Sequence, residues 1–256
     1  MPARKLAAVL VLLHLDEQGE LCVTLTTRAK HLRSHPGETA LPGGRFELEH
    51  DRNVQDTALR EAWEEINVPA DDPDASLLYL TTLSPFSSRT LLVVTPVVYF
   101  LPLGASAARA WLARHVDPNA DEVDAVFSAQ LRAFLGHTRG VQHEHEDFVW
   151  LNDSGYRLHI FKDRHWVADC TGLTADILIA TALLAFHGVA DCDGPLSMAK
   201  EKQKVLLGYE RWARGQLAFS EIVRLALLST DPNARQGLAA RRPTASDALQ
   251  ERLEAT

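Results

Sequence analysis

Three glutamates within five consecutive residues are the part of this sequence best suited to chemistry. Glu61, Glu64 and Glu65 are spaced i, i+3 and i+4, so on a helix their carboxylates share one face. Like charges at this spacing destabilise a helix by roughly 0.2–0.5 kcal/mol per pair, and Arg60 supplies only one nearby positive charge. A hard divalent cation would offset the excess, because Mg²⁺ prefers oxygen ligands. Taken alone, the three glutamates favour the alternative, an ordinary solvent-exposed helix face.

Two glycines before the helix change this balance. Gly43 and Gly44 follow a strand-like run and allow the backbone to bend sharply and to approach other groups closely. Such a turn can bring a main-chain carbonyl into the carboxylate cluster. The combination of glycine turn and clustered acids favours a metal site over a solvated face.

The helix that carries the glutamates has a recognisable start and a recognisable buried face. Asn53 is a good N-cap, and we expect the Asp56 side chain to reach back to the cap amide. Apolar residues at helical spacing predict one buried stripe. These residues are Val54, Ala58, Leu59, Ala62, Trp63 and Ile66.

The stretch from Leu41 to Val68 resembles a Nudix box, whose consensus is G-x5-E-x7-R-E-U-x-E-E-x-G-U with U apolar. Gly44, the run Arg60 to Glu65 and Val68 match it. Asn67 replaces the usual glycine at the helix end, a mild change because asparagine tolerates the left-handed conformation.

The loop of the box is longer than the consensus. The interval from Arg45 to Leu59 holds 15 residues, where the consensus holds 13. Counting therefore does not place the first glutamate of the box, and Glu47, Glu49 and Asp51 compete for that position.

A basic segment precedes the glycines. Its positive and imidazole side chains fall within eight residues, and they are Arg28, Lys30, His31, Arg33 and His35. The segment is similar to the motif of the coenzyme A pyrophosphatase branch of Nudix hydrolases, roughly LLTxR and then RxxxGxxxFPGG. The matching residues are Leu25, Thr26, Arg28, Arg33, Gly37, Pro42, Gly43 and Gly44, while Leu41 stands where phenylalanine is usual. The alternative reading is a solvated basic loop.

The resemblance implies Mg²⁺- or Mn²⁺-dependent hydrolysis of the diphosphate in coenzyme A and its derivatives, with 3′,5′-ADP and 4′-phosphopantetheine products. The implied metal ligands are Glu61, Glu64, Glu65 and the Gly44 carbonyl. Arg60 would orient the carboxylates, and the substrate would be bound by Arg28, Arg33, Gly43 and Gly44.

The resemblance does not identify which acid accepts the proton of the attacking water. Glu61 is the first candidate. Glu122 is the second, because it lies in a segment from Pro118 to Phe127 that resembles the PNxxEVxxVF motif of the same branch.

Two other functions stay open. The pocket of a Nudix enzyme can accept another nucleoside diphosphate compound, such as an oxidised nucleoside triphosphate, ADP-ribose or a dinucleotide. A non-catalytic Nudix-fold binding module is the other alternative, although such a module has no need of three clustered carboxylates.

Strand and helix signals alternate along the chain and predict an α/β fold. The expected strands are Leu6–Leu15, Leu21–Thr27, Leu77–Leu83 and Leu91–Leu101, followed by a two-stranded region over Gln142–His165. The expected helices after the Nudix box are Ala105–His115, Ser128–Leu135 and an apolar helix that Gly172 opens. Pro96 predicts that its strand lies at a sheet edge or carries a bulge.

The resemblance implies an α/β/α sandwich with a mixed central sheet. We expect this Nudix domain to span residues 1–190, and a helical C-terminal extension to span 191–256. The extension could dimerise the protein into a homodimer, pack on the core or remain mobile.

Composition narrows the partners and the compartment. A formal net charge of −8 makes general nucleic-acid binding a poor expectation. Cys22, Cys170 and Cys192 form no close pair and indicate free thiols in a reducing compartment. No apolar run approaches the roughly 18 residues that span a membrane. We expect a soluble intracellular protein, cytoplasmic by default; the family also occurs in peroxisomes and mitochondria, for which the sequence carries no clear signal.

Overall fold

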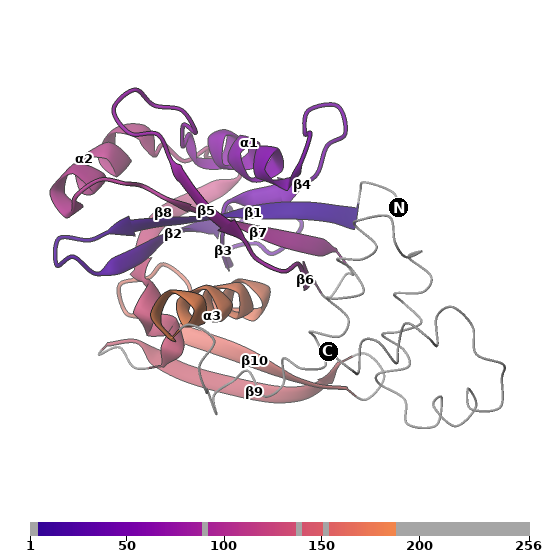
Figure 1. Ribbon diagram of the computed structural model, residues 1–256. Coiled ribbons are helices and arrows are strands. Elements are labelled where there is room, and N and C mark those ends of the chain that lie inside the picture. Colours follow the sequence, from indigo (N-terminus) through magenta and orange to yellow (C-terminus); the bar gives the residue numbers. More distant parts are fainter. Residues whose placement is uncertain (1–4, 89–91, 137–139, 151–153, 188–256) are drawn as a thin grey trace, which may run out of the picture. The chain divides into compact units, whose positions relative to one another are not determined.

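A computed structural model describes residues 5–88, 92–136, 140–150 and 154–187 of the chain (Figure 1). The chain divides into two units. The larger unit, residues 2–145 and 159–190, holds the main sheet and the three α-helices found in the described residues. The smaller unit, within the described residues, consists of 146–150 and 154–158, which belong to strands β9 and β10. The predicted extension over residues 191–256 and Cys192 lie outside the described residues.

The main sheet is mixed, as expected. Its path runs β3 (Thr39–Ala40), β2 (Leu21–Arg28), β1 (Leu6–Leu15), β7 (Val93–Phe100) and β5 (Leu78–Thr82). β4 (Gly43–Arg45) also pairs with β1, β6 (Phe86–Ser87) with β7, and β8 (Val123–Gln130) with β2. The β1–β7 pair is parallel, whereas the others in this sheet are antiparallel.

Helices cover both faces of the main sheet, which confirms the expected sandwich (Figure 1). On one face Leu10 and Leu12 of β1 pack with Ala62 of α1 (Val54–Ile66), and α2 (Ala105–His115) joins the same core. On the other face Val11 of β1 packs with Leu178 of α3 (Gly172–His187). β1 is apolar at nearly every position because successive side chains point to opposite faces and both faces are covered.

A second sheet has the order β11 (Cys170–Thr171), β10 (Ser154–Lys162) and β9 (Gln142–Trp150). β9 and β10 confirm the two strands expected over Gln142–His165. The helix expected from Gly172 is also confirmed, and α3 covers one face of the main sheet.

Pro96 does not lie on an edge strand, so the edge alternative was wrong, whereas the pairing of its strand β7 with β5 does contain a bulge-type register shift, between Tyr79 and Thr81 of β5. β7 lies between β1 and β5, and Pro96 is aligned with Val9 of β1. The carbonyl of Pro96 accepts from the amide of Leu83, in the interval after β5 ends and before β6 begins. A residue's N–H and C=O point to the same side of a strand. The backbone N–H that proline lacks would therefore face the residues between β5 and β6, so its absence removes no hydrogen bond between β7 and a paired strand.

The helix expected over Ser128–Leu135 is only partly present. β8 continues to Gln130, and a short 3₁₀ helix, η2 (Leu131–Leu135), follows it. Pairing of β8 with β2, from Val123 opposite Arg28 to Gln130 opposite Cys22, keeps Ser128 and Gln130 in the sheet. Tertiary strand pairing thus overrides the local helical pattern.

Two further observations bear on the compartment. Cys22 and Cys170 are free thiols, as expected, and both are buried. Within the described residues, no helix combines the length and the apolar character that crossing a membrane would require.

Candidate active site

The carboxylate-bearing helix α1 begins and ends at the predicted caps. The Asn53 side chain accepts from the Asp56 amide at 2.9 Å, and Asn67 ends the helix in the left-handed conformation with φ 56°. The Asp56 carboxylate, however, accepts from the amide of Arg52 at 3.1 Å, so the expected bond back to the cap amide was wrong by one residue. The caps fix where the helix starts, and hence which side chains face the sheet.

Fewer apolar residues of α1 are fully buried than the apolar pattern predicted. Ala58, Ala62 and Ile66 are fully buried, but Trp63 is 54% exposed. Glu65 is buried in its place, at 5% exposure. An acid therefore occupies the edge of the stripe that faces the glycine turn.

Two of the three glutamates share Arg60 as their partner, and the third accepts from the backbone. Glu64 accepts from Nη1 of Arg60 at 2.9 Å, and Glu61 accepts from Nη2 of the same arginine at 3.1 Å. Glu65 accepts from the amide of Gly43 at 3.1 Å. Arg60 therefore contacts two of the carboxylates, and the acids are held by Arg60 on one side and by the backbone of the glycine turn on the other.

Asp51 is the one of the three competing loop acids that contacts Arg60. Its side chain is fully buried and accepts from Nε and Nη2 of Arg60 at 2.9 and 3.0 Å. The hydroxyl of Thr57 and the amide of Glu47 donate to its second oxygen. Burial alone would raise the pKa of Asp51, but these donors together hold it below its usual range. The Glu47 and Glu49 side chains are exposed.

Gly44 forms a cradle for Glu61. A β-carbon at Gly44 would collide with the carboxylate of Glu61. A β-carbon at Gly43 would collide with the carbonyl of Ala8 and with Val9. The glycines therefore permit a close approach of β4 to both β1 and α1, as the sequence indicated.

The carboxylates facing the turn are electrostatically crowded. Burial raises the pKa of Glu65 to about 7, against the lowering effects of the Gly43 amide and Arg28 and with further raising by Glu61 and Glu122. The pKa of Glu61 is also raised, chiefly by burial, although Arg60 opposes the shift. The Asn119 amide donates to the Glu65 carbonyl at 2.8 Å, so the fold brings the segment that carries the distant Glu122 against α1, where Glu122 raises the pKa of both glutamates.

The structure separates the two predicted phosphate-binding arginines. Arg28, at the end of β2, has Nη1 3.9 Å from Oε1 of Glu65 and therefore lies at the carboxylate cluster. Arg33 is exposed, and no hydrogen bond or ion pair of its side chain occurs within the described part of the chain. Of the two, only Arg28 lies beside the carboxylates of α1.

The donor set fits a hard divalent cation. The oxygens of Glu61 and Glu65 repel each other and Glu122, and the Glu61 carboxylate rests against the Gly44 backbone, where a side chain would fill the space. Crowded oxygen donors of this kind are the ligands that Mg²⁺ or Mn²⁺ takes. In the described residues no three acidic, histidine or cysteine side chains converge as a ready-made cluster, because Arg60 holds Glu64 and the Gly43 amide holds Glu65.

Local sequence alone does not select Asp51 over Glu47 and Glu49. Its burial and its contact with Thr57 depend on how the loop folds back onto α1. The only local signal was that aspartate is the shorter side chain and lies closest to the helix start, which does not exclude Glu47 or Glu49.

Comparison with known proteins agrees with the geometry. The family model described as "NUDIX domain" matches residues 4–152. Nudix hydrolase 15, mitochondrial, of Arabidopsis thaliana is 40% identical over 186 residues, which are 72% of this chain and 59% of the relative. The chain thus spans less than two thirds of that plant protein.

A second relative is the peroxisomal coenzyme A diphosphatase ndx-8 of Caenorhabditis elegans, which is 33% identical over 177 residues, 69% of this chain and 67% of the relative. A solved structure of a MutT/nudix family protein from Enterococcus faecalis is 19% identical, covers 90% of this chain and 75% of that one, and aligns with a TM-score of 0.40. The extent of the family match and the identity to these relatives show that the chain belongs to the Nudix family.

Proposed function

We propose that this protein hydrolyses the diphosphate bond of coenzyme A and its derivatives with the help of Mg²⁺ or Mn²⁺, giving 3′,5′-ADP and 4′-phosphopantetheine products. The observation that carries this proposal is the contact between Arg28 and Glu65. It puts a guanidinium from the coenzyme A-type motif beside the carboxylates of the Nudix helix. A relative named coenzyme A diphosphatase supports the same substrate.

Glu61, Glu64, Glu65 and the Gly44 carbonyl are the proposed cation ligands. When bound, the cation would supply positive charge against the diphosphate and favour loss of a proton from the attacking water. Arg60 engages only Oε2 of Glu64, so the other oxygen of this carboxylate could bind the cation, and Arg60 keeps its two bonds to Asp51. Asp51 and Arg60 therefore keep the end of the loop fixed to α1.

Glu61 is the proposed acceptor of the water's proton. Its raised pKa makes it a stronger base than an ordinary carboxylate, and general bases work best with a pKa near the working pH. Glu122 is the second candidate, because it lies close enough to raise the pKa of both Glu61 and Glu65. Hydrolysis adds one water across the P–O–P bond, so each product leaves with its own phosphate.

Arg28 and Arg33 are the proposed substrate contacts. A guanidinium can bind two phosphate oxygens at once. Arg28 lies beside the reacting centre and would contact the diphosphate, whereas the exposed Arg33 is free to contact the 3′-phosphate. Gly43 and Gly44, which admit no side chain, would leave room for the diphosphate at the turn.

The test is a substrate panel read by mass spectrometry. Purified protein with Mg²⁺ or Mn²⁺ is given coenzyme A, 3′-dephospho-coenzyme A, ADP-ribose, a dinucleoside polyphosphate and an oxidised nucleoside triphosphate. We expect 3′,5′-ADP from coenzyme A at the highest kcat/KM, and incorporation of ¹⁸O from labelled water identifies the attacked phosphorus. A higher kcat/KM for another substrate would identify that compound, and not coenzyme A, as the preferred substrate. If no compound of the panel is hydrolysed in the presence of the cation, the result would favour a non-catalytic binding module.

A further inference from the structure

A group of histidines lies on strands β9 and β10 of the second sheet. His143 and His145 belong to β9, and His159 belongs to β10. All three lie in the larger of the two units. None of the proposed catalytic or substrate-binding residues belongs to this sheet, so the proposed hydrolysis assigns these histidines no role.

Two of the imidazoles face each other through their nitrogens. Nε2 of His143 lies 2.9 Å from Nδ1 of His159. The ring centroids are 5.2 Å apart, and the ring planes are inclined by 23°. At this separation one nitrogen donates a hydrogen and the other accepts it, so the two facing nitrogens share a single proton. At least one facing nitrogen therefore carries a lone pair, which is the feature of histidine that binds metal ions.

His145 lies on the same side of β9 as His143, because residues two apart on a strand point to the same face. The ring centroids of His143 and His145 are 6.4 Å apart. Both side chains are exposed, whereas His159 is only 4% exposed. An ion can therefore reach the two histidines of β9 from solvent, and the buried His159 supplies a fixed nitrogen behind them.

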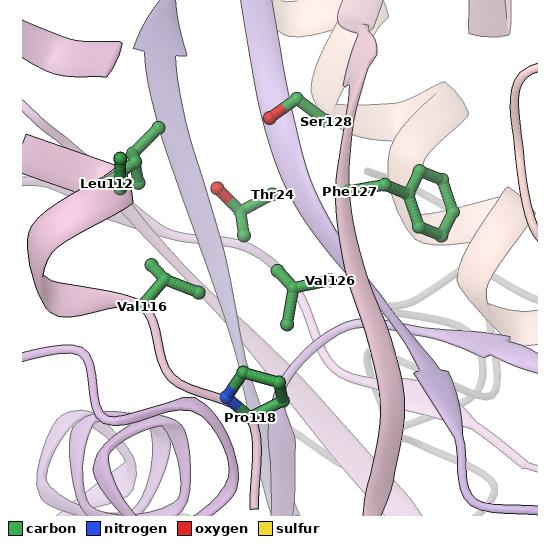
Figure 2. Close-up of a pocket in the computed structure, with 8 residues that line it drawn as sticks. Thr24, Leu112, Val116, Pro118, Val126, Phe127 and Ser128 are labelled. Atoms are coloured by element: carbon green, nitrogen blue, oxygen red, sulfur yellow. The ribbon is translucent and has the colours of Figure 1, made fainter. Parts of the chain in front are cut away.

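Aromatic packing holds the ring of His143 in place. This ring stacks on that of Phe161, with centroids 4.5 Å apart and planes inclined by 13°. Phe161 is 1% exposed and packs edge-on against Phe134, which in turn stacks on Trp166. The Trp166 ring lies 6.1 Å from that of Phe127, which turns away from the hollow between α2, β2 and β8 (Figure 2). His143 thus rests on an aromatic group of the core, which limits its rotation.

The carboxylates of two neighbouring residues are already engaged. Nζ of Lys162 donates to Glu144 at 2.7 Å, and Nε and Nη2 of Arg157 donate to Asp147, each at 2.7 Å. Within the described ranges, no three histidine, cysteine or acidic side chains are already placed to hold a metal ion together. A third ligand therefore requires rotation of a side chain, which the exposure of His145 allows.

We propose that His143 and His159 bind a divalent transition-metal ion, with Zn²⁺ as the best match, and that the His145 side chain rotates to become the third ligand. Imidazole nitrogen suits Zn²⁺, whereas Mg²⁺ prefers oxygen. Three histidines and a water make up one of the ligand sets of four-coordinate zinc. The site joins β9 to β10, because its ligands come from both strands.

The geometry of the pair needs little change to accept the ion. Tetrahedral zinc with Zn–N bonds of about 2.0–2.1 Å separates two ligating nitrogens by about 3.3 Å, so the pair of His143 and His159 opens by only about 0.4 Å. The ring that donates in the pair moves its proton to its other nitrogen. Both facing nitrogens then offer a lone pair to the ion, and both imidazoles stay neutral.

The first experiment is calorimetric titration of the full-length protein with ZnCl₂ in the presence of millimolar Mg²⁺, which competes for the proposed carboxylate site. We expect His143→Gln to lower the zinc affinity about tenfold or more, since loss of a residue that merely orients a ligand already costs 10–100-fold. His145→Gln should lower it by a smaller factor. His165→Gln, at an exposed position on neither strand, is the control and should match the parent.

X-ray absorption at the zinc edge identifies the ligands directly. With one equivalent of Zn²⁺ we expect the outer-shell scattering of imidazole in the parent and its loss in His143→Gln. Thermal unfolding gives a further readout, because an ion that binds only the folded protein raises Tm. Zn²⁺ should raise Tm of the parent but not of His143→Gln, and circular dichroism without zinc checks that the variant is folded.

Three outcomes would overturn the proposal. Parent-like zinc affinity of His143→Gln would remove the histidine pair as the site, and zinc bound only by oxygen or sulfur would place the ion elsewhere. Parent-like affinity of His145→Gln would remove the third ligand and with it the three-histidine site. Glu64→Gln is expected to keep zinc binding at the histidines, so failure of the hydrolase assignment would not affect this result.

Discussion

Arg60 holds the fully buried Asp51 through two hydrogen bonds, of 2.9 and 3.0 Å, from Nε and Nη2. The same guanidinium reaches Glu64, Glu61 and the carbonyl of Arg45. A single side chain thus connects the loop, strand β4 and the acidic face of α1. The geometry of the carboxylates therefore depends on a residue that need not touch the substrate.

Replacement of Asp51 by asparagine should destabilise the protein. The substitution leaves the charge of Arg60 without its buried partner, and removing one member of a buried ion pair costs about 3 kcal/mol. We expect kcat to fall at least tenfold as well, because the carboxylates lose their fixed position. Urea unfolding and steady-state kinetics measure the two effects. Glu47→Gln and Glu49→Gln are the controls, and a comparable loss in either would contradict the assignment of Asp51.

Glu64→Gln should nearly abolish hydrolysis while leaving the fold intact. Glu64 is half exposed, and its ion pair with Arg60 lies at the surface, so the free energy of unfolding should change by less than about 1 kcal/mol. Loss of one proposed cation ligand should lower kcat by a factor of 100 or more. Circular dichroism and product quantification provide the readouts. Retained turnover in this variant would remove the proposed site.

Gly44→Ala should impair the site through its backbone. The added methyl group would displace the Glu61 carboxylate from the turn, so we expect at least a tenfold lower kcat. Gly104→Ala is a matched control, because a β-carbon there meets no atom within 4 Å and its φ of −62° suits alanine. Product formation and cation affinity should both decline for Gly44→Ala only. Normal activity would show that Glu61 does not depend on the Gly44 cradle.

Arg33→Ala should distinguish substrates by their 3′-phosphate. The side chain of the exposed Arg33 makes no hydrogen bond or ion pair within the described residues, so its removal should not disturb the fold. We expect KM for coenzyme A to rise about tenfold and KM for 3′-dephospho-coenzyme A to stay unchanged. Parallel kinetics on the two substrates provide the comparison. Equal effects on both, or none on either, would count against a 3′-phosphate contact.

His14 should make stability depend on pH. Burial lowers its pKa below 6.5, outweighing the opposite effects of the Leu15 carbonyl and Asp16. Below pH 6.5 the unfolded chain therefore binds more protons than the folded protein, so the free energy of unfolding should fall until the pH reaches the folded pKa. The stabilisation is fully present above pH 6.5. Thermal unfolding from pH 8 to 5 measures the effect.

His14→Gln should reduce that dependence on pH. Glutamine at this position does not titrate, so the part of the stability loss that comes from His14 should disappear. His165→Gln, at an exposed position, serves as the control and should follow the parent curve. A parent-like pH curve for His14→Gln would contradict the prediction.

The sequence by itself determined the local elements whose signals lie close together. Asn53 and Asn67 cap α1 because a side-chain oxygen and a left-handed conformation are needed at those two positions. The Arg60–Glu64 pair follows from helical spacing alone. Gly44 was recognised because only glycine permits the close approach that the Glu61 carboxylate makes.

Only the tertiary structure decided the contacts between distant segments. The selection of Asp51, the approach of Glu122 to α1 and the proximity of Arg28 to Glu65 depend on chain reversals that no local spacing encodes. The edge position considered for the Pro96 strand was wrong for the same reason, because the side of a strand that lacks a partner is set by its neighbours in the sheet. Local propensity acts within a few residues, whereas burial and strand pairing join groups that are far apart in the chain.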